Sequence, residues 1–219
     1  MPNYKLTYFN FRGIGEVPRQ LFHLSGTPFE DDRLDGPDYI YPGQKFEVWD
    51  EMKPKTPFGR VPILSVDGFE IPESAAICRY LARKFGYAGK TPEEAAWADA
   101  IVDQFKDFGV AFRPTIVAQR AGKPAEEIQK LREETYIPAR DNYFRNLNRI
   151  LEKSKSGFLV GDGLTWADLV LADSLYTLGN MKELDESNKE HLKLKKFQER
   201  IYGLPELKDY IAKRPASVF

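Results

Sequence analysis

The pattern of apolar residues in this 219-residue chain changes near residue 86, and this change constrains the fold more than any other feature. Before residue 86, short apolar runs alternate with helical patterns and turn signals. After it, apolar residues recur almost wholly at helical spacing. Mixed elements followed by helices alone predict an α/β domain over residues 1–86 and an all-α domain over residues 87–219.

The first 86 residues carry signals for strands and helices in alternation. Strands are expected over residues 5–9, 29–34, 61–66 and 69–71, of which 29–34 has the weakest pattern. Helices are expected over residues 15–25, 46–52 and 73–85. Asp67-Gly68 is typical of a tight hairpin turn, and the Gly- and Pro-containing residues 35–43 are expected to form a loop.

Pro62 follows Val61 at the start of the most apolar strand. Proline cannot donate a ladder hydrogen bond, so it belongs at a strand edge or a strand's first residue. A proline considered alone favours an ordinary trans bond, but an X-Pro bond is the one place where cis is inexpensive. The context Pro57–Leu64 favours a cis bond, which would turn the Val61 amide and carbonyl toward an extended peptide ligand.

The second half predicts long helices over residues 92–118, 125–155, 189–201 and 205–213, with a bend at Pro138 in the second. Thr165 and Asp168 stand at the spacing of a capping box and predict the start of another helix. Five aromatic and aliphatic residues of the first helix are expected to form its core stripe: Trp97, Ile101, Phe105, Phe108 and Phe112.

Charge and cysteine content exclude several classes of function. The net charge is −1, from 32 basic and 33 acidic residues, so no overall field attracts nucleic acid or an anionic membrane. We expect no signal peptide and no membrane span, and therefore a cytoplasmic protein. The single cysteine, Cys78, excludes an intrachain disulfide and is expected to be a buried apolar residue. The histidines and this cysteine lack metal-ligand spacing, so no metal site is expected.

Tyr8 lies near the end of the apolar stretch Tyr4–Phe9, before a turn that contains Gly13 and Gly15. That position places a phenol at the mouth of a strand-to-helix turn. Taken alone, Tyr8 is more simply interpreted as a half-buried strand tyrosine whose hydroxyl bonds water.

Four segments together are specific enough to indicate a family: Tyr4–Gly13, Pro57–Leu64, Glu73–Leu81 and Gly157–Asp168. Over essentially its whole length the chain resembles the cytosolic glutathione transferases, most nearly the sigma class and its nematode relatives. Residues 1–10 are also similar to the start of the glutathione-dependent prostaglandin D synthases. The resemblance implies a thioredoxin-like N-terminal domain, an all-helical C-terminal domain and a homodimer.

The resemblance implies that the Tyr8 hydroxyl holds the glutathione sulfur as a thiolate. A free cysteine thiol has a pKa near 8.5, and stabilising the thiolate enough to bring the pKa to about 6.5 requires about 2.7 kcal/mol. One charge-assisted hydrogen bond supplies about 1.5–3 kcal/mol. A single hydroxyl is therefore nearly sufficient. Glutathione acts here as a co-substrate, and no cofactor is implied.

The family's glutathione contacts map onto matching positions of this chain. Trp49 and Lys53 are assigned to the glycine end of the tripeptide, and the Val61 backbone, beside Pro62, to its cysteinyl part. Glu73 and Ser74 are assigned to the γ-glutamyl end, where a helix N-terminus suits a carboxylate. Arg60 is a weaker candidate that is equally consistent with a solvated surface residue.

Asp107 is assigned to the ligand of the partner subunit, although it also fits a solvated acidic stripe of its helix. The electrophile pocket is assigned to apolar and basic residues of both domains: Phe9, Arg12, Ile14, Phe108, Phe112 and Arg113. The aromatic members suit a small hydrophobic electrophile, although they also fit an ordinary core.

The chain departs from the family pattern at three places. Ile14 stands where many sigma-class members have an arginine, which leaves Tyr8 with less electrostatic support, and Arg12 is the nearest basic residue in sequence. Lys106 stands where the prostaglandin synthases carry an interface carboxylate. Residues 36–46 form a longer loop than usual, and a different register would bring Tyr39 rather than Trp49 to the glycine end.

Three functions remain open at this point. The first is conjugation of glutathione to hydrophobic electrophiles. The second is glutathione-dependent prostaglandin isomerisation, and the third is non-catalytic binding of haem or another apolar ligand.

Overall fold

The computed structural model describes residues 2–35 and 46–217, and the chain divides into two compact units. One unit comprises Met1–Ala88 with Arg200–Phe219, and the other comprises Gly89–Glu199. The first boundary lies close to the change of pattern near residue 86. The C-terminal segment differs from the expected division because α9 (Pro205–Lys213) packs against α1 (Glu16–Ser25) of the first unit.

The described residues of the first unit form a four-stranded sheet in the order β2-β1-β3-β4. Its strands are β1 (Tyr4–Phe9), β2 (Glu30–Leu34), β3 (Ile63–Val66) and β4 (Phe69–Pro72). β1 and β2 are parallel neighbours, and α1 connects them along the chain. β3 pairs antiparallel with both β1 and β4. This mixed sheet confirms the expected thioredoxin-like α/β arrangement. β3 begins after Pro62, whose nitrogen has no hydrogen to donate to a ladder.

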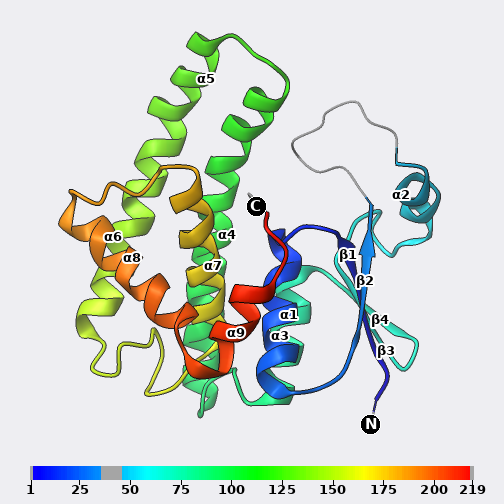
Figure 1. Ribbon diagram of the computed structural model, residues 1–219. Helices are drawn as coiled ribbons and strands as arrows, with labels where there is room; N and C mark the ends of the chain where they lie inside the picture. Colours follow the sequence, from blue (N-terminus) through cyan, green and yellow to red (C-terminus); the bar gives the residue numbers. More distant parts are fainter. Residues whose placement is uncertain (1, 36–45, 218–219) are drawn as a thin grey trace. The chain divides into compact units, whose positions relative to one another are not determined.

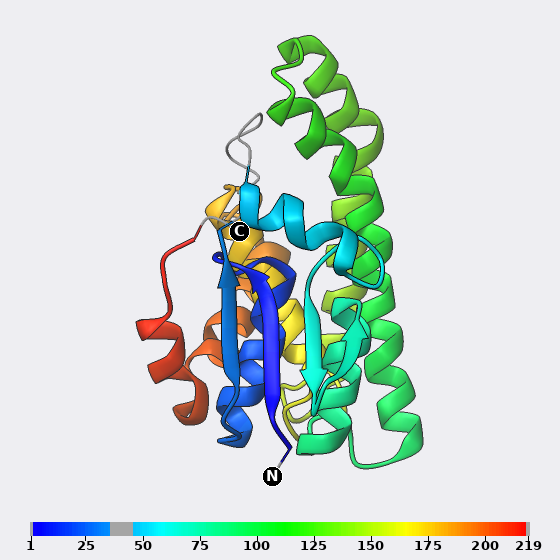
Figure 2. The same ribbon diagram turned by 90° about the vertical axis from the view of Figure 1, so that its right-hand side faces the viewer.

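Two helices cover one face of this sheet, and a third short helix lies on its other side. α1 and α3 (Ser74–Phe85) lie together on the first face, and α2 (Glu47–Met52) lies opposite (Figures 1 and 2). The Tyr4 ring of β1 packs against α1 and α3, with its centroid 5.3 Å from that of Phe22 on α1 and 6.3 Å from that of Phe85 on α3. Cys78 is buried here, as expected, and burial raises the pKa of its thiol.

The second unit is helical, as expected. Its helices are α4 (Pro92–Arg120), α5 (Ala125–Leu131), α6 (Ile137–Lys153), α7 (Trp166–Asn180) and most of α8 (Lys189–Tyr202). The single helix expected over residues 125–155 is interrupted by a π-helical turn at Arg132–Tyr136. This irregularity lies immediately before Pro138, which cannot continue the helical hydrogen-bond ladder.

The prediction that Trp97 belongs to the core stripe of α4 is wrong. Ile101 and Phe108 are buried at 5 % exposure, but Trp97 is 51 % exposed. Trp97 lies near the first turns of α4, where its indole lines an open pocket of about 510 Å³ with Ile150 and Phe158. The helical period places Trp97 on the expected stripe, but its side chain lines this open pocket and is half exposed instead of packing in the core.

The start of α7 confirms the expected capping box. The Asp168 carboxylate accepts hydrogen bonds at 2.8 Å from the Thr165 amide and the Thr165 hydroxyl, and at 2.8 Å from the Leu159 amide. Asp168 is fully buried. Burial raises the pKa of Asp168 to about 6, although the three donors act in the opposite direction.

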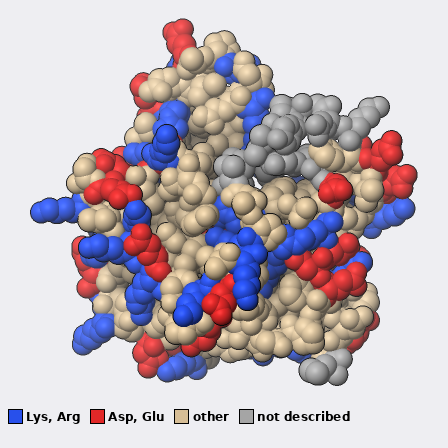
Figure 3. Space-filling view, viewed as in Figure 1, with Lys and Arg blue, Asp and Glu red and all other residues tan. Residues whose placement is uncertain are grey.

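Charged groups of both signs lie on the surface of the molecule. Figure 3 shows basic and acidic side chains interspersed over the face it presents, in keeping with a net charge of −1. Among residues 2–35 and 46–217, no helix combines the length and apolarity that crossing a membrane would require.

Candidate active site

Tyr8 is positioned by the central strand of the sheet. It pairs with Arg33 of β2, and its neighbour Thr7 pairs with Ile63 of β3. Ile63 in turn pairs with Pro72 of β4. Extending these registers by one residue brings Tyr8, Pro62 and Glu73 to the same edge of the sheet. The sheet thus collects at one edge three residues that the sequence assigned to one site.

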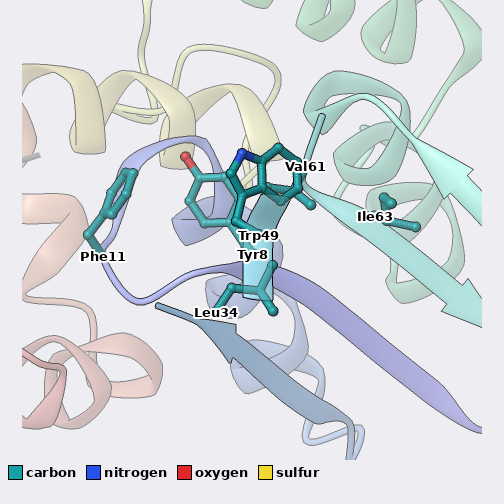
Figure 4. Close-up of a cluster of buried hydrophobic side chains, with 6 residues drawn as sticks. All are labelled: Tyr8, Phe11, Leu34, Trp49, Val61 and Ile63. Atoms are coloured by element: carbon teal, nitrogen blue, oxygen red, sulfur yellow. The ribbon is translucent and has the colours of Figure 1, made fainter. Parts of the chain in front are cut away.

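The Tyr8 side chain is only 3 % exposed and belongs to an apolar cluster. Figure 4 shows this cluster, which contains Tyr8, Phe11, Leu34, Trp49, Val61 and Ile63. Phe9 packs against its edge, with its ring centroid 5.1 Å from Trp49 in an edge-to-face arrangement. The cluster holds the phenol ring in place through close packing on several sides.

The turn Gly13–Gly15, a single 3-10 turn, closes over the phenol. A β-carbon at Gly13 would lie 2.6 Å from the Tyr8 hydroxyl oxygen, and one at Gly15 would lie 2.3 Å from the ring carbon Cδ1. Both distances are far below van der Waals contact, so only glycine permits this approach. Gly13 also has a φ of +41°, in the left-handed region that favours glycine. The turn backbone therefore determines where the hydroxyl lies.

Arg19 is a site residue that the sequence reasoning missed. Its guanidinium carbon lies 5.7 Å from the centroid of the Tyr8 ring, and the residue is 1 % exposed. It donates to the carbonyls of Phe11 at 2.9 Å and Phe9 at 3.3 Å, and it pairs with Asp31 at 3.0 Å. The expectation of little positive charge beside Tyr8 is therefore wrong. The sequence signal for a buried cation near Tyr8 was an arginine placed among the apolar residues of α1.

The residues of the turn expected to face the electrophile lie in different environments. Ile14 is 52 % exposed, so the turn presents an apolar side chain to solvent. Arg12 is instead 3 % exposed and donates from Nη2 to the carbonyl of Ser217 at 2.9 Å. Arg12 is thus buried against the C-terminal segment, because its guanidinium finds a backbone acceptor there.

Some of the residues assigned to the glycine end and the middle of glutathione lie in the apolar cluster around Tyr8, and others lie on the surface. Trp49 is buried on α2, and Lys53 is exposed where α2 ends. Val61 is 7 % exposed, and the Val61-Pro62 bond is cis, as expected. The alternative residue for the glycine end, Tyr39, lies outside the described residues.

Glu73 and Ser74 begin α3 at the edge of the sheet. Glu73 has φ 71° and ψ 116°, a conformation that costs a non-glycine residue about 1–3 kcal/mol. Its exposed carboxylate lies 4.0 Å from Arg60 Nη1. Ser74 is the half-buried first residue of this twelve-residue helix. Free amides and a hydroxyl at a helix N-terminus form a suitable binding place for a carboxylate.

The predicted site residues of α4 belong to the helical unit and are described within it. Phe108 is buried, with its ring parallel to that of Tyr143 and the centroids 4.9 Å apart. Phe112 is half-buried, 5.3 Å from the centroid of Tyr136. Asp107 is exposed on α4. Phe108 thus packs in the core of its own unit. This agrees with the alternative prediction, in which the aromatic residues of the expected pocket form an ordinary core.

The residues around Tyr8 combine three chemical capacities. A phenol hydroxyl can donate a hydrogen bond, the buried Arg19 cation favours nearby negative charge, and the start of α3 can receive a carboxylate. Within the described residues, no group of three or more His, Cys, Asp and Glu side chains has the geometry of a metal site.

Comparison with known proteins gives matches along both halves of the chain. A family model described as "Glutathione S-transferase, N-terminal domain" matches residues 4–83, and one described as "Glutathione S-transferase, C-terminal domain" matches residues 106–214. Glutathione S-transferase 3 of Caenorhabditis elegans is 48 % identical over 219 residues, covering 100 % of both chains.

Solved structures match equally fully. The glutathione S-transferase of Ascaris lumbricoides has a TM-score of 0.86 and 44 % identity, with 100 % of both chains covered. Monomeric Na-GST-3 of Necator americanus has a TM-score of 0.85 and 38 % identity, covering 99 % of this chain and 100 % of its own. Prostaglandin synthase D of Nilaparvata lugens has a TM-score of 0.82 and 30 % identity, with the same coverage.

Proposed function

The chain belongs to the glutathione S-transferase family, and from this premise we propose that the Tyr8 hydroxyl donates a hydrogen bond to the sulfur of bound glutathione. The reaction is transfer of an alkyl or aryl group to that sulfur. The observation that carries the proposal is the seating of Tyr8, whose hydroxyl lies against the backbone of the Gly13–Gly15 turn at the end of β1.

Two groups favour the thiolate in this proposal. The Tyr8 hydroxyl supplies one charge-assisted hydrogen bond of about 1.5–3 kcal/mol. Arg19 adds a positive charge that neighbouring protein groups already fix at the face of the phenol ring. The range for the hydroxyl alone includes the stabilisation of about 2.7 kcal/mol that separates a thiol of pKa 8.5 from one near 6.5. The Arg19 charge, which Asp31 partly compensates, adds to it.

The remainder of glutathione follows the edge of the sheet in this proposal. The Val61 amide and carbonyl bond the cysteinyl part, beside Pro62. The γ-glutamyl carboxylate occupies the N-terminus of α3 at Ser74, next to the strained Glu73. Lys53, exposed after α2, binds the terminal carboxylate at the glycine end, and the neighbouring Trp49 shapes that end from within the cluster.

The electrophile is proposed to be a small hydrophobic molecule. Ile14 presents an exposed apolar side chain on the turn that touches Tyr8, and Phe9 lies at the edge of the same cluster. Phe108 and Phe112 lie on α4 of the other unit, and their part in the electrophile pocket stays a prediction from the sequence. We assign Arg12 to support of the turn, because it is buried.

A second candidate is glutathione-dependent prostaglandin isomerisation. It is favoured by the likeness to the prostaglandin synthase D of Nilaparvata lugens and by the sequence of residues 1–10. Both reactions use a glutathione thiolate held by Tyr8. They are distinguished by supplying a prostaglandin endoperoxide or an aryl halide to the same enzyme and comparing kcat/KM.

Class, assembly and location are further parts of the proposal. We place the chain in the sigma class and in the cytoplasm, where glutathione is reduced and a single cysteine is ordinary. We propose a homodimer in which Asp107 reaches the partner's glutathione. A relative from Necator americanus is described as monomeric, so sedimentation equilibrium of this chain is the direct test.

The catalytic proposal is tested with the Tyr8→Phe variant. We expect retention on immobilised glutathione but a loss of about 10²-fold in aryl-halide turnover at neutral pH, because one transition-state hydrogen-bond donor is removed. Tyr87→Phe is the matched control, since its hydroxyl donates to the Leu24 carbonyl at 3.2 Å in the same unit. Full activity of Tyr8→Phe would show that another group stabilises the thiolate.

A further inference from the structure

A buried ion pair joins the C-terminal segment to the start of α1. Arg214 Nη1 lies 2.7 Å from Glu16 Oε1, and the two side chains are only 5 % and 2 % exposed. The Arg214 guanidinium carbon also lies 4.8 Å from the centroid of the Tyr202 ring. Glu16 is the first residue of α1, where a carboxylate also complements the helix dipole. Arg214 is thus held by two partners, the Glu16 carboxylate and the Tyr202 ring.

A second bond joins the same segment to the other end of the glycine turn. Arg12 Nη2 donates to the Ser217 carbonyl at 2.9 Å, and Arg12 is 3 % exposed. Arg12 precedes the turn Gly13–Gly15, and Glu16 follows it. Arg214 and Ser217 therefore hold the turn at both of its ends.

The part of the turn between these two attachments is the part that touches Tyr8. Gly13 approaches the Tyr8 hydroxyl, and Gly15 approaches its ring, more closely than any β-carbon would allow. Glycine has more conformational freedom than other residues, so a turn with two glycines needs tertiary contacts to keep one position. The segment 214–217 supplies contacts of this kind on either side.

We propose that Arg214 is a positioning residue, which with the Ser217 carbonyl holds the Arg12–Glu16 turn against Tyr8 and so sets where the phenol hydroxyl meets the glutathione sulfur. The inference rests on the proposed role of Tyr8. Removing Arg214 leaves the buried Glu16 carboxylate without its nearest cation, and the first turn of α1 then moves toward water. A hydroxyl displaced from the sulfur stabilises the thiolate less.

The test compares Arg214→Met with Lys213→Met, which removes an exposed charge from the preceding position of the same segment. The measurements are thiolate absorbance of the enzyme–glutathione complex against pH, and the pH profile of kcat with an aryl halide. For Arg214→Met we expect the pKa of the bound thiol to rise and kcat at pH 6.5 to fall about tenfold, as for a modest misplacement of a catalytic group.

The Michaelis constant for glutathione should change less than about twofold in Arg214→Met, because the proposed binding contacts lie just before β3, on and just after α2, and at the start of α3. Arg214→Lys should recover part of the loss, and Lys213→Met should match the wild type. A folded Arg214→Met enzyme with a wild-type thiolate titration would overturn the inference.

A second variant keeps Arg214 and addresses the other attachment. Deleting residues 217–219 removes the carbonyl that Arg12 contacts, and it decides the question if Arg214→Met does not fold. We expect the bound thiol pKa to rise here also, and an unchanged titration would overturn the inference. Failure of the proposed function has a different signature: the wild-type complex itself would then show no thiolate below pH 8.

Discussion

Two helix starts in this molecule each bury a carboxylate, but they satisfy it in opposite ways. Asp168 at the start of α7 receives its three hydrogen bonds from Leu159 and Thr165, no more than nine residues away. Glu16 at the start of α1 pairs with Arg214, which is 198 residues away. The first arrangement is complete within one local segment. The second exists only after the chain ends have come together.

This difference has a functional consequence. The local cap at α7 stabilises the helical unit. The long-range pair at α1 adjoins the turn that seats Tyr8, so it connects the stability of the first unit to the geometry of its site. The two carboxylates should therefore respond differently to substitution.

The largest effect is expected from Glu16→Ala. The substitution leaves the buried Arg214 guanidinium without its carboxylate, and breaking a buried pair in this way costs about 3–5 kcal/mol. Urea unfolding measures the loss, and kcat at pH 6.5 should fall as well. Asp209→Ala, at an exposed position of α9, serves as the control. A stable Glu16→Ala enzyme would remove the contrast between the two carboxylates.

Asp168→Ala should destabilise the protein by about 3 kcal/mol, because buried donors at Leu159 and Thr165 lose their acceptor. Urea unfolding is again the measurement. The thiolate titration of the bound complex should stay at its wild-type value under conditions where the variant is folded. A shifted titration would show that the cap of α7 also influences the site.

The pH dependence of stability should report on the buried carboxylate of Asp168. Burial raises the pKa of Asp168 to about 6, above its ordinary value of 3.8 in the unfolded chain. Between these values the folded protein holds a proton that the unfolded chain has lost, so stability falls as pH rises. The contribution between pH 4 and pH 6 is about 2 kcal/mol.

Asp168→Asn should lack this contribution, because an amide does not titrate. The measurement is the free energy of unfolding of both proteins at pH 4, 5 and 6. Parallel curves for wild type and Asp168→Asn would contradict the assigned pKa.

The smallest of these effects, and the most local, is expected from Gly15→Ala. Its β-carbon would lie 2.3 Å from the Tyr8 ring, and its ordinary φ of −87° leaves this steric conflict as the main consequence. The ring must shift, and kcat should fall about tenfold. Gly109→Ala is the matched control: its β-carbon meets nothing within 4 Å, and alanine in a helix interior gains about 0.5–1 kcal/mol. Equal kcat in both variants would show that the turn does not constrain Tyr8.

The same contrast explains what could be predicted from the sequence. The capping box of α7, the Asp67-Gly68 hairpin and the helix 205–213 depend on neighbouring residues, and each appears as expected. Tyr8 and Pro62 were recognisable because they stand within specific local motifs.

Arg19, Arg214 and the exposed side of Trp97 were not predictable. Their environments depend on how segments distant in the sequence lie against one another. The sequence likewise predicts a simple bend at Pro138, whereas the structure has a π-helical turn before that residue. Periodicity alone does not distinguish the two.

An ultraviolet titration of the bound glutathione thiolate in wild type and Tyr8→Phe measures what the Tyr8 hydroxyl contributes to the thiolate. In the wild type we expect the bound thiol to ionise well below the pKa of 8.5 of a free cysteine thiol. In Tyr8→Phe the pKa should rise toward that value. Superimposable titrations of the two proteins would show that the Tyr8 hydroxyl does not stabilise the thiolate.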